Sequence, residues 1–192
     1  MKVAWLVSGN IRNLVEIHDS WENNFFKYYD VDVYFHLWSY ADFAEKGDAF
    51  FPDCCTYEEA VDLYNPKRHE KECISTIECF RARNFSNMAP ETRVFNVLSM
   101  WDKWKKSFAF LDPNSSYDVI IKARSDLILN ERLILKKPRA NQLFSGHHVL
   151  SDLLFWGDFK SMKTTMNIID DFERHNTVLG ETLIWRYSSM RT

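Results

Sequence analysis

The stretch Tyr117-Asp118-Val119-Ile120-Ile121-Lys122-Ala123-Arg124-Ser125-Asp126-Leu127-Ile128-Leu129-Asn130 decides the fold. Its apolar, β-branched run at 119–121 is typical of a strand buried on both faces. Lys122, Arg124 and Asp126 follow at alternate positions, so they project from one face. Two cations and a carboxylate are costly to bury unless charged groups meet them. A nucleoside diphosphate with its divalent cation would satisfy all three, because Lys and Arg suit phosphate and Asp suits a hard metal.

The same pattern has a structural alternative. Arg124 and Asp126 are two residues apart, so on a strand they lie side by side and can form a self-contained ion pair. The strand pattern alone leaves both interpretations open.

The segments around this stretch predict an α/β fold. Strands and helices alternate along the chain, and the predicted segments are strand 2–7, turn 8–10, helix 14–29, strand 31–38, helix 57–64, helix 92–110 and strand 142–146. Asp158 is expected to cap a helix from Phe159, and a last helix is expected from Gly180. Residues 39–92 are expected to be an irregular insertion or acceptor-side region, with a short strand at 72–80. We therefore expect one domain over 1–192, a mostly parallel sheet flanked by helices.

Composition excludes several classes of protein. The 192 residues are 46% hydrophobic and 27% charged, enough for an ordinary core. The net charge of −3 and the lack of a dense basic cluster argue against a nucleic-acid partner. The apolar N-terminal run is too short for a signal peptide or a membrane span, so a soluble cytoplasmic protein is expected. Four cysteines fall between residues 54 and 79 and are expected as reduced thiols, with a zinc site near His69 as the alternative.

Other candidate ligand-binding residues end the first two strands. In an open α/β sheet the loop after the first strand lies at the carboxyl edge, where ligands bind, so Arg12 is placed for a phosphate or a base. His36 and Trp38 arrive at the same edge. Each has a structural alternative: a solvated arginine at a helix start, a hydrogen-bonded histidine, and a tryptophan that covers the core.

Four motifs in this order resemble bacterial and viral capsular-polysaccharide glycosyltransferases. They are Ser8-Gly9-Asn10-Ile11-Arg12, Asp32-Val33-Tyr34-Phe35-His36-Leu37-Trp38, Tyr117-Asp118 with Arg124-Ser125-Asp126, and Ser151-Asp152-Leu153-Leu154-Phe155-Trp156-Gly157 with Met162. Gly180-Glu181-Thr182-Leu183 is similar to the last Glu-containing helix of that family. The matches are spread over most of the chain.

The resemblance implies a GT-A fold, a single Rossmann-like domain that binds a nucleotide sugar with Mn²⁺ or Mg²⁺. The donor would be a UDP-, GDP- or dTDP-sugar and the acceptor a glycan, in polysaccharide biosynthesis in the cytoplasm of a bacterium or a virus-infected host cell. The expected donor-binding residues are Ser8, Gly9, Arg12, His36, Trp38, Lys122 and Arg124. The family usually holds its metal with an Asp-x-Asp pair, whereas this chain has Arg124 at the first position. Only Asp126 matches the metal ligand.

Glycosyl transfer also needs a group that takes the proton of the acceptor hydroxyl. Asp152 is the candidate base of an inverting enzyme, with Glu181 next, and the sequence does not decide between inversion and retention. The competing class is a non-catalytic nucleotide- or glycan-binding domain of the same fold, in which Arg124 marks lost activity. A metal-dependent phosphohydrolase is disfavoured because such sites collect several Asp and His ligands.

Overall fold

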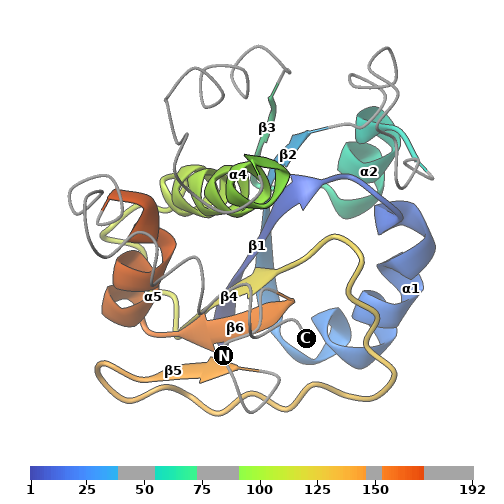
Figure 1. Cartoon of the computed structure of the whole chain (residues 1–192). Coiled ribbons are helices and arrows are strands. Elements are labelled where there is room, and N and C mark those ends of the chain that lie inside the picture. Colours follow the sequence, from blue (N-terminus) through green and yellow to red (C-terminus); the bar gives the residue numbers. More distant parts are fainter. Residues whose placement is uncertain (39–54, 73–90, 146–152, 171–192) are drawn as a thin grey trace.

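A computed structural model of the chain describes residues 1–38, 55–72, 91–145 and 153–170, with the backbone alone for 91–98. The elements, in chain order, are β1 (Lys2–Asn10), α1 (Leu14–Asn24), the 3-10 helix η1 (Phe26–Tyr28), β2 (Asp30–Trp38), α2 (Tyr57–Tyr64), β3 (Arg68–Lys71), α4 (Glu91–Phe108), β4 (Val119–Ala123), β5 (Leu143–Ser145), β6 (Leu154–Gly157) and α5 (Phe159–Met166), as Figure 1 shows.

Within the described residues the strands form one six-stranded sheet in the order β3-β2-β1-β4-β6-β5. β1 pairs in parallel with β2 and β4, and β2 in parallel with β3. β6 is antiparallel to both β4 and β5. The predicted mixed α/β fold with a mostly parallel sheet is therefore confirmed at this level.

Helices cover both faces of the sheet (Figure 1). One face carries α1 and α2, and its core includes Trp5, Trp21 and Tyr64. The rings of Trp5 and Trp21 are 5.1 Å apart, centroid to centroid, in an edge-to-face arrangement. The other face carries α4 and α5, with Trp104 and Met162 in the core. β1 is in the middle of the sheet and is buried from both sides, as its apolar run predicts.

The strand order creates a switch point beside β1. From β1 the chain continues through α1 to β2 on one side, and it later returns through α4 to β4 on the other side. The parallel strands β1 and β4 thus end side by side, with Val7 in register with Ala123. Ligands of open α/β sheets bind outside the carboxyl ends of strands at such a point.

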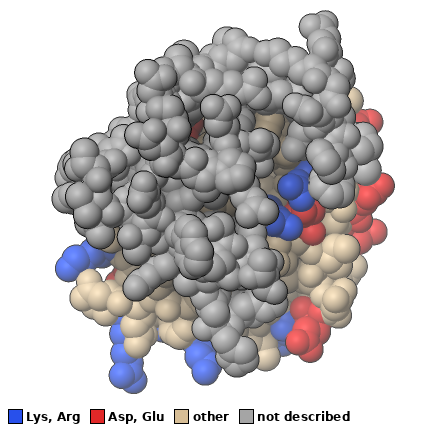
Figure 2. Space-filling model, in the orientation of Figure 1, with Lys and Arg blue, Asp and Glu red and all other residues tan. Residues whose placement is uncertain are grey.

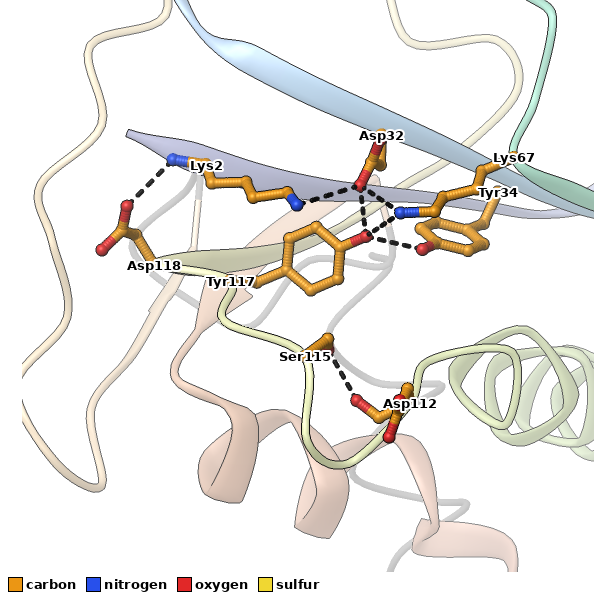
Figure 3. A network of polar contacts seen from close by, with 8 residues as sticks. All are labelled: Lys2, Asp32, Tyr34, Lys67, Asp112, Ser115, Tyr117 and Asp118. Atoms are coloured by element: carbon orange, nitrogen blue, oxygen red, sulfur yellow. Dashed lines mark hydrogen bonds and ion pairs between the residues drawn. The ribbon is translucent and has the colours of Figure 1, made fainter.

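A polar network joins the opposite, amino edge of the same strands (Figure 3). Asp32 of β2 accepts a hydrogen bond from Lys67 Nζ at 2.9 Å and another from the Tyr117 hydroxyl, just before β4. The hydroxyls of Tyr34 and Tyr117 lie 2.6 Å apart, and Lys2 of β1 is 3.8 Å from Asp32. Burial raises the pKa of Tyr117, and the Asp32 carboxylate raises it further. Asp32 and Tyr117, which belong to two of the motifs, therefore hold the amino ends of the four parallel strands together. We call this network the lock (Lys2, Asp32, Tyr34, Lys67 and Tyr117).

Two predicted boundaries differ from the structure. β1 continues to Asn10, so the predicted turn at 8–10 is wrong; the pairing of Gly9 with Leu37 and of Asn10 with Trp38 outweighs the turn-forming residue types. The predicted helix 14–29 ends at Asn24, and η1 replaces its last turn. Phe25 packs on Trp5 at 4.6 Å between ring centroids, so a core contact is made outside the helix.

Helix α2 matches its prediction, with a capping box between Thr56 and Glu59. Strand β5 and helix α5 are also confirmed, and the side chain of Asp158 accepts a hydrogen bond from Ser161 N at 2.7 Å.

The sequence did not predict the short strand β3, because its four residues are all exposed and lack any apolar alternation. Cys55 is not in a disulfide. The expected strand beyond residue 72, the helix from Gly180 and the other three cysteines lie outside the described residues.

Candidate functional site

The loops after β1 and β4 bring three predicted residues together, which we call the arginine clamp (Arg12, Arg124 and Asp126). Arg124 Nε donates to Asp126 Oδ1 at 2.5 Å, and Arg124 Nη2 donates to Oδ2 at 3.1 Å. Arg12 Nη1 also donates to Asp126 Oδ2. The side chains of Arg12 and Arg124 are each 29% exposed and that of Asp126 is 19% exposed. The Arg124–Asp126 ion pair that alternation allowed is thus formed, a second arginine joins it, and solvent reaches all three side chains.

The backbone that holds the clamp is specialised. Arg12 has φ 51°, in the left-handed region that residues with a Cβ seldom occupy. The hydroxyl of Ser125 donates to the carbonyl oxygen of Asn10, which fastens the loop after β4 to the end of β1. Arg124 N donates to Leu153 O at 2.9 Å. The positions of the two arginines are therefore set by main-chain contacts as well as by Asp126.

The clamp carries a net positive charge. Burial raises the pKa of Asp126, but the hydrogen bonds and charges of Arg124 and Arg12 outweigh burial and leave the pKa below its usual value. The carboxyl is therefore ionised near neutral pH. The three clamp side chains together carry a net charge of +1, and guanidinium groups suit an anionic ligand.

Next to the clamp, three buried polar side chains line the α4 side of the sheet. Ser8 and Asn10 are on β1, and His36, which is in register with Ser8, is on β2. Their residues are 4%, 8% and 1% exposed, respectively. In the part of the chain that the structure describes, Ser8 Oγ, Asn10 Oδ1 and His36 Nδ1 have no hydrogen-bond partner. Because buried polar atoms are nearly always paired, these three atoms mark a place for a hydrogen-bonding ligand or for water.

His36 is uncharged at neutral pH. Burial, with help from the positive charges of Lys103 and Lys106, lowers its pKa to about 3. Its Nε2 is 4.0 Å from Glu70 Oε1, and its ring centroid is 5.7 Å from that of Phe110. The neutral ring can accept or donate a hydrogen bond but supplies no charge for a phosphate.

The other predicted donor-binding residues lie at different depths. Lys122 is only 1% exposed, and its Nζ is 5.1 Å from the ring centroid of Trp104 beneath α4, so the structure does not bring it into the clamp. Gly9 has φ 117°, and a Cβ added there would meet no atom within 4 Å. Open space beside a strand end permits close approach by a ligand. Trp38 ends β2 opposite Asn10 and is half-buried.

The two expected bases, Asp152 and Glu181, lie outside the described residues. Sequence reasoning missed Asn10 and Ser125 as parts of this site. Asn10 was assigned to a turn, although its even position on β1 places it on the same face as Ser8. Ser125 lies between the two charged residues of the motif, and its residue type alone predicts no role for it. Among the residues that the structure describes, no three or more His, Cys, Asp or Glu side chains gather as a metal-binding group.

Acidic side chains gather along one side of the described surface, over α1 and α2 (Figure 2). The exposed acidic residues of these helices are Glu16, Asp19, Glu22, Glu58, Glu59 and Asp62. A surface of this charge repels a nucleic-acid backbone, because binding there depends on Lys and Arg.

None of the helices in the described ranges combines the length and the apolar character needed to cross a membrane. No protein-family model, curated protein or solved structure matches the chain. Function is therefore inferred from the chain's own residues and their geometry.

Proposed function

We propose that this chain is a GT-A type glycosyltransferase, which moves a sugar from a nucleoside-diphosphate sugar to a glycan or another hydroxyl acceptor. The observation that carries the proposal is the arginine clamp at the switch point between β1 and β4. This is the position where open α/β sheets bind ligands, and guanidinium groups match phosphate oxygens in charge and geometry.

Three buried polar atoms, of Ser8, Asn10 and His36, have no hydrogen-bond partner among the described residues, and they support the same proposal. They lie on one face at the ends of β1 and β2, and the carbonyl of Asn10 is fastened to Ser125 in the middle of the clamp loop. A nucleotide sugar offers hydroxyl and N–H groups close to its diphosphate. Such a ligand can pair the buried polar atoms and meet the arginines at the same time.

The resemblance implies Mn²⁺ or Mg²⁺ on Asp126, and the contacts of that carboxylate argue against it. Both of its oxygens accept hydrogen bonds from guanidinium groups. A cation bound there would have to displace at least one arginine and would then face the charge of the other. The described residues therefore do not fit a divalent metal at Asp126.

The proton of the acceptor hydroxyl needs a base, and Asp152 remains the prediction, with Glu181 as the second candidate. The replacement Asp152→Asn is expected to lower the turnover of an inverting enzyme by a factor of about 10² to 10⁴ without loss of donor binding. The rival function is a non-catalytic nucleotide- or glycan-binding domain. The presence of Arg124 in place of the usual aspartate favours this alternative. A non-catalytic domain would bind the donor but show no turnover.

A thermal-shift screen against UDP-, GDP-, CMP- and dTDP-sugars tests the proposal. A donor at about 100 times its dissociation constant is expected to add roughly 2.7 kcal/mol to the free energy of unfolding. Donors that stabilise the protein are then incubated with it, and release of the free nucleotide is measured, a nucleoside diphosphate from UDP-, GDP- and dTDP-sugars and CMP from CMP-sugars. Arg132→Met is the matched control for Arg124→Met, because Arg132 stacks on Tyr28 at 3.9 Å and takes no part in the clamp. If no sugar nucleotide stabilises the wild type, the proposed function is wrong.

A further inference from the structure

We propose that the arginine clamp itself neutralises the departing diphosphate, with Arg12 and Arg124 as the groups that contact it and Asp126 as a positioning residue. The inference rests on the proposed function and deepens it, because it predicts a transferase that works without a divalent cation.

The first argument is the state of Asp126. Its side chain is only 19% exposed, and three N–H groups from two arginines converge on its two oxygens. A carboxylate in this setting acts as a counter-ion that brings two like charges close together and fixes the planes of both guanidinium groups. Without it, Arg12 and Arg124 would repel each other.

The second argument is the match between the clamp and a diphosphate. Guanidinium groups form paired, parallel hydrogen bonds with carboxylates and with phosphates in the same geometry. Each guanidinium group carries five N–H donors, so a donor diphosphate can bind both arginines while Asp126 holds them in position, with little movement of either side chain. Both arginine side chains are 29% exposed, so donor binding needs no opening of the core.

The third argument is the construction of the loops. Arg12 holds a left-handed backbone, which costs a residue with a Cβ about 1 kcal/mol or more, and Ser125 fastens the second loop to Asn10. An ordinary surface ion pair needs neither feature. These contacts fix the two arginines before the donor arrives, and electrostatic stabilisation is strongest when the charges are already in place.

In the transfer step, the bond between the anomeric carbon and the β-phosphate oxygen breaks, and its electron pair stays on that oxygen. A bond forms between the anomeric carbon and the acceptor hydroxyl oxygen, whose proton passes to the general base. The leaving diphosphate gains one negative charge as the bond breaks. Arg12 and Arg124 meet that charge, so no metal ion is required to balance it.

The direct test measures the affinity of wild-type protein for the sugar nucleotides by calorimetry, once in EDTA and once in excess Mn²⁺. We expect a donor whose dissociation constants in the two buffers agree within about threefold. Binding that requires Mn²⁺ would overturn the inference and leave the proposed function standing. An absence of binding in both buffers would overturn the proposed function and this inference together.

Variants of the clamp give a second test, in EDTA, with circular dichroism to confirm folding. Loss of one charge-assisted contact predicts donor binding about 10- to 100-fold weaker for Arg124→Met, while Arg132→Met binds like the wild type. Free guanidinium ion is expected to restore part of the activity of Arg124→Ala. Wild-type affinity in Arg124→Met would contradict the inference.

Asp126→Asn separates the two roles of the carboxylate. If Asp126 is a positioning residue, the substitution is expected to raise the KM for the donor and to leave the KM for the acceptor unchanged. The rise in the donor KM should be the same in EDTA and in Mn²⁺. A metal ligand would instead show a loss confined to Mn²⁺, and that outcome would overturn the inference.

Discussion

Arg12 combines an unusual backbone with a charged side chain in the candidate site. Arg12→Gly and Arg12→Ala both remove the guanidinium group, so both are expected to lose donor binding. They differ only in the backbone, because glycine adopts φ 51° without strain and alanine does not. We expect the glycine variant to be more stable than the alanine variant by about 1 kcal/mol in urea unfolding. Equal stability would show that the left-handed conformation is not retained in solution.

His36 makes stability depend on pH. Its pKa falls from the ordinary 6.5 to about 3 in the fold, because the ring is buried and lies near the positive charges of Lys103 and Lys106. Glu70 also faces the ring, at 4.0 Å, and its charge acts in the opposite direction. Above pH 6.5 neither the folded nor the unfolded state protonates the His36 ring, so its effect is absent. Below pH 6.5 the His36 ring binds a proton in the unfolded state but stays neutral in the folded state. The free energy of unfolding should fall by about 1.4 kcal/mol per pH unit from His36 alone.

The check is chemical unfolding of wild type and His36→Gln between pH 6.5 and pH 4. The aspartates with lowered pKa values lose their stabilising effect only below the ordinary value of 3.8, outside this window; they are Asp32, Asp118, Asp126 and Asp158. The effect of Glu59 begins to be lost below its ordinary value of 4.5, but both proteins share it, so the difference between their profiles reports His36. The variant is expected to lack the slope. Parallel pH profiles for the two proteins would contradict the assignment of His36 as a buried neutral ring.

Alternation along one strand predicts that Lys122, Arg124 and Asp126 share a face. This prediction is wrong beyond Lys122, because β4 ends at Ala123 and a turn from Arg124 to Leu127 follows. Alternation also does not predict how deeply a side chain is buried. Helix α4 covers Lys122, whereas Arg124 and Asp126 lie beyond the end of β4 and are partly exposed. Nor does alternation give contacts between distant segments. The hydrogen bond from Arg12 to Asp126 depends on β1 and β4 being neighbours, which no local pattern reveals.

Among the elements, the four parallel strands are locked at their amino edge by the hydroxyl of Tyr117 (Figure 3). Tyr117→Phe removes a donor to the Asp32 carboxylate and leaves Tyr34 without its partner hydroxyl. We expect a loss of about 1–3 kcal/mol of stability in urea unfolding, with donor affinity unchanged, because the lock is at the opposite edge from the clamp. Tyr28→Phe is the control, on an exposed tyrosine. A large loss of donor affinity in Tyr117→Phe would contradict the division of the motif into a structural half and a ligand-binding half.

The end of β3 is tied to α4 by buried charges. Glu72, 6% exposed at its side chain, pairs with Lys103, 2% exposed, and lies 2.5 Å from Lys106 Nζ. Burial, with the nearby charge of Lys106, lowers the pKa of Lys103 to about 7. At pH 6, where Lys103 is protonated, Glu72→Gln removes its counter-charge and is expected to cost about 3–5 kcal/mol of stability. Lys106→Met should cost about 1 kcal/mol or less, because Lys106 is partly solvated and Glu72 keeps Lys103. Similar losses in the two variants, measured by urea unfolding, would contradict this view of the ion pairs.

Element prediction succeeded where apolar periodicity was strong and failed where backbone pairing decided the structure. The buried strand β4 shows a continuous apolar run, and helix α4 shows apolar residues at three- and four-residue spacing, among them Trp101, Trp104 and Phe108. β3 consists of exposed charged residues, and only its ladder with β2 makes it a strand. The last residues of β1 are strand for the same reason. The hydrogen bonds that make these residues strand come from the neighbouring strand, so the sequence of the residues themselves does not show a strand pattern.

For the whole molecule, the sheet gives different tasks to the two halves of the Asp32–Trp38 motif and of the Tyr117–Asp126 motif. The amino ends of the parallel strands carry the lock around Asp32 and Tyr117, and the carboxyl ends of β1 and β4 carry the arginine clamp. The sequence predicted the α/β class because strands and helices alternate. It did not predict the strand order, and that order is what brings Arg12 to Asp126.

The measurement that tests the central claim most directly is a crystal structure of the protein with a nucleoside-diphosphate sugar, grown in EDTA. We predict the diphosphate at the carboxyl ends of β1 and β4, with its oxygens hydrogen-bonded to the guanidinium groups of Arg12 and Arg124. A donor bound elsewhere on the molecule, with both arginines still closed on Asp126, would contradict the claim.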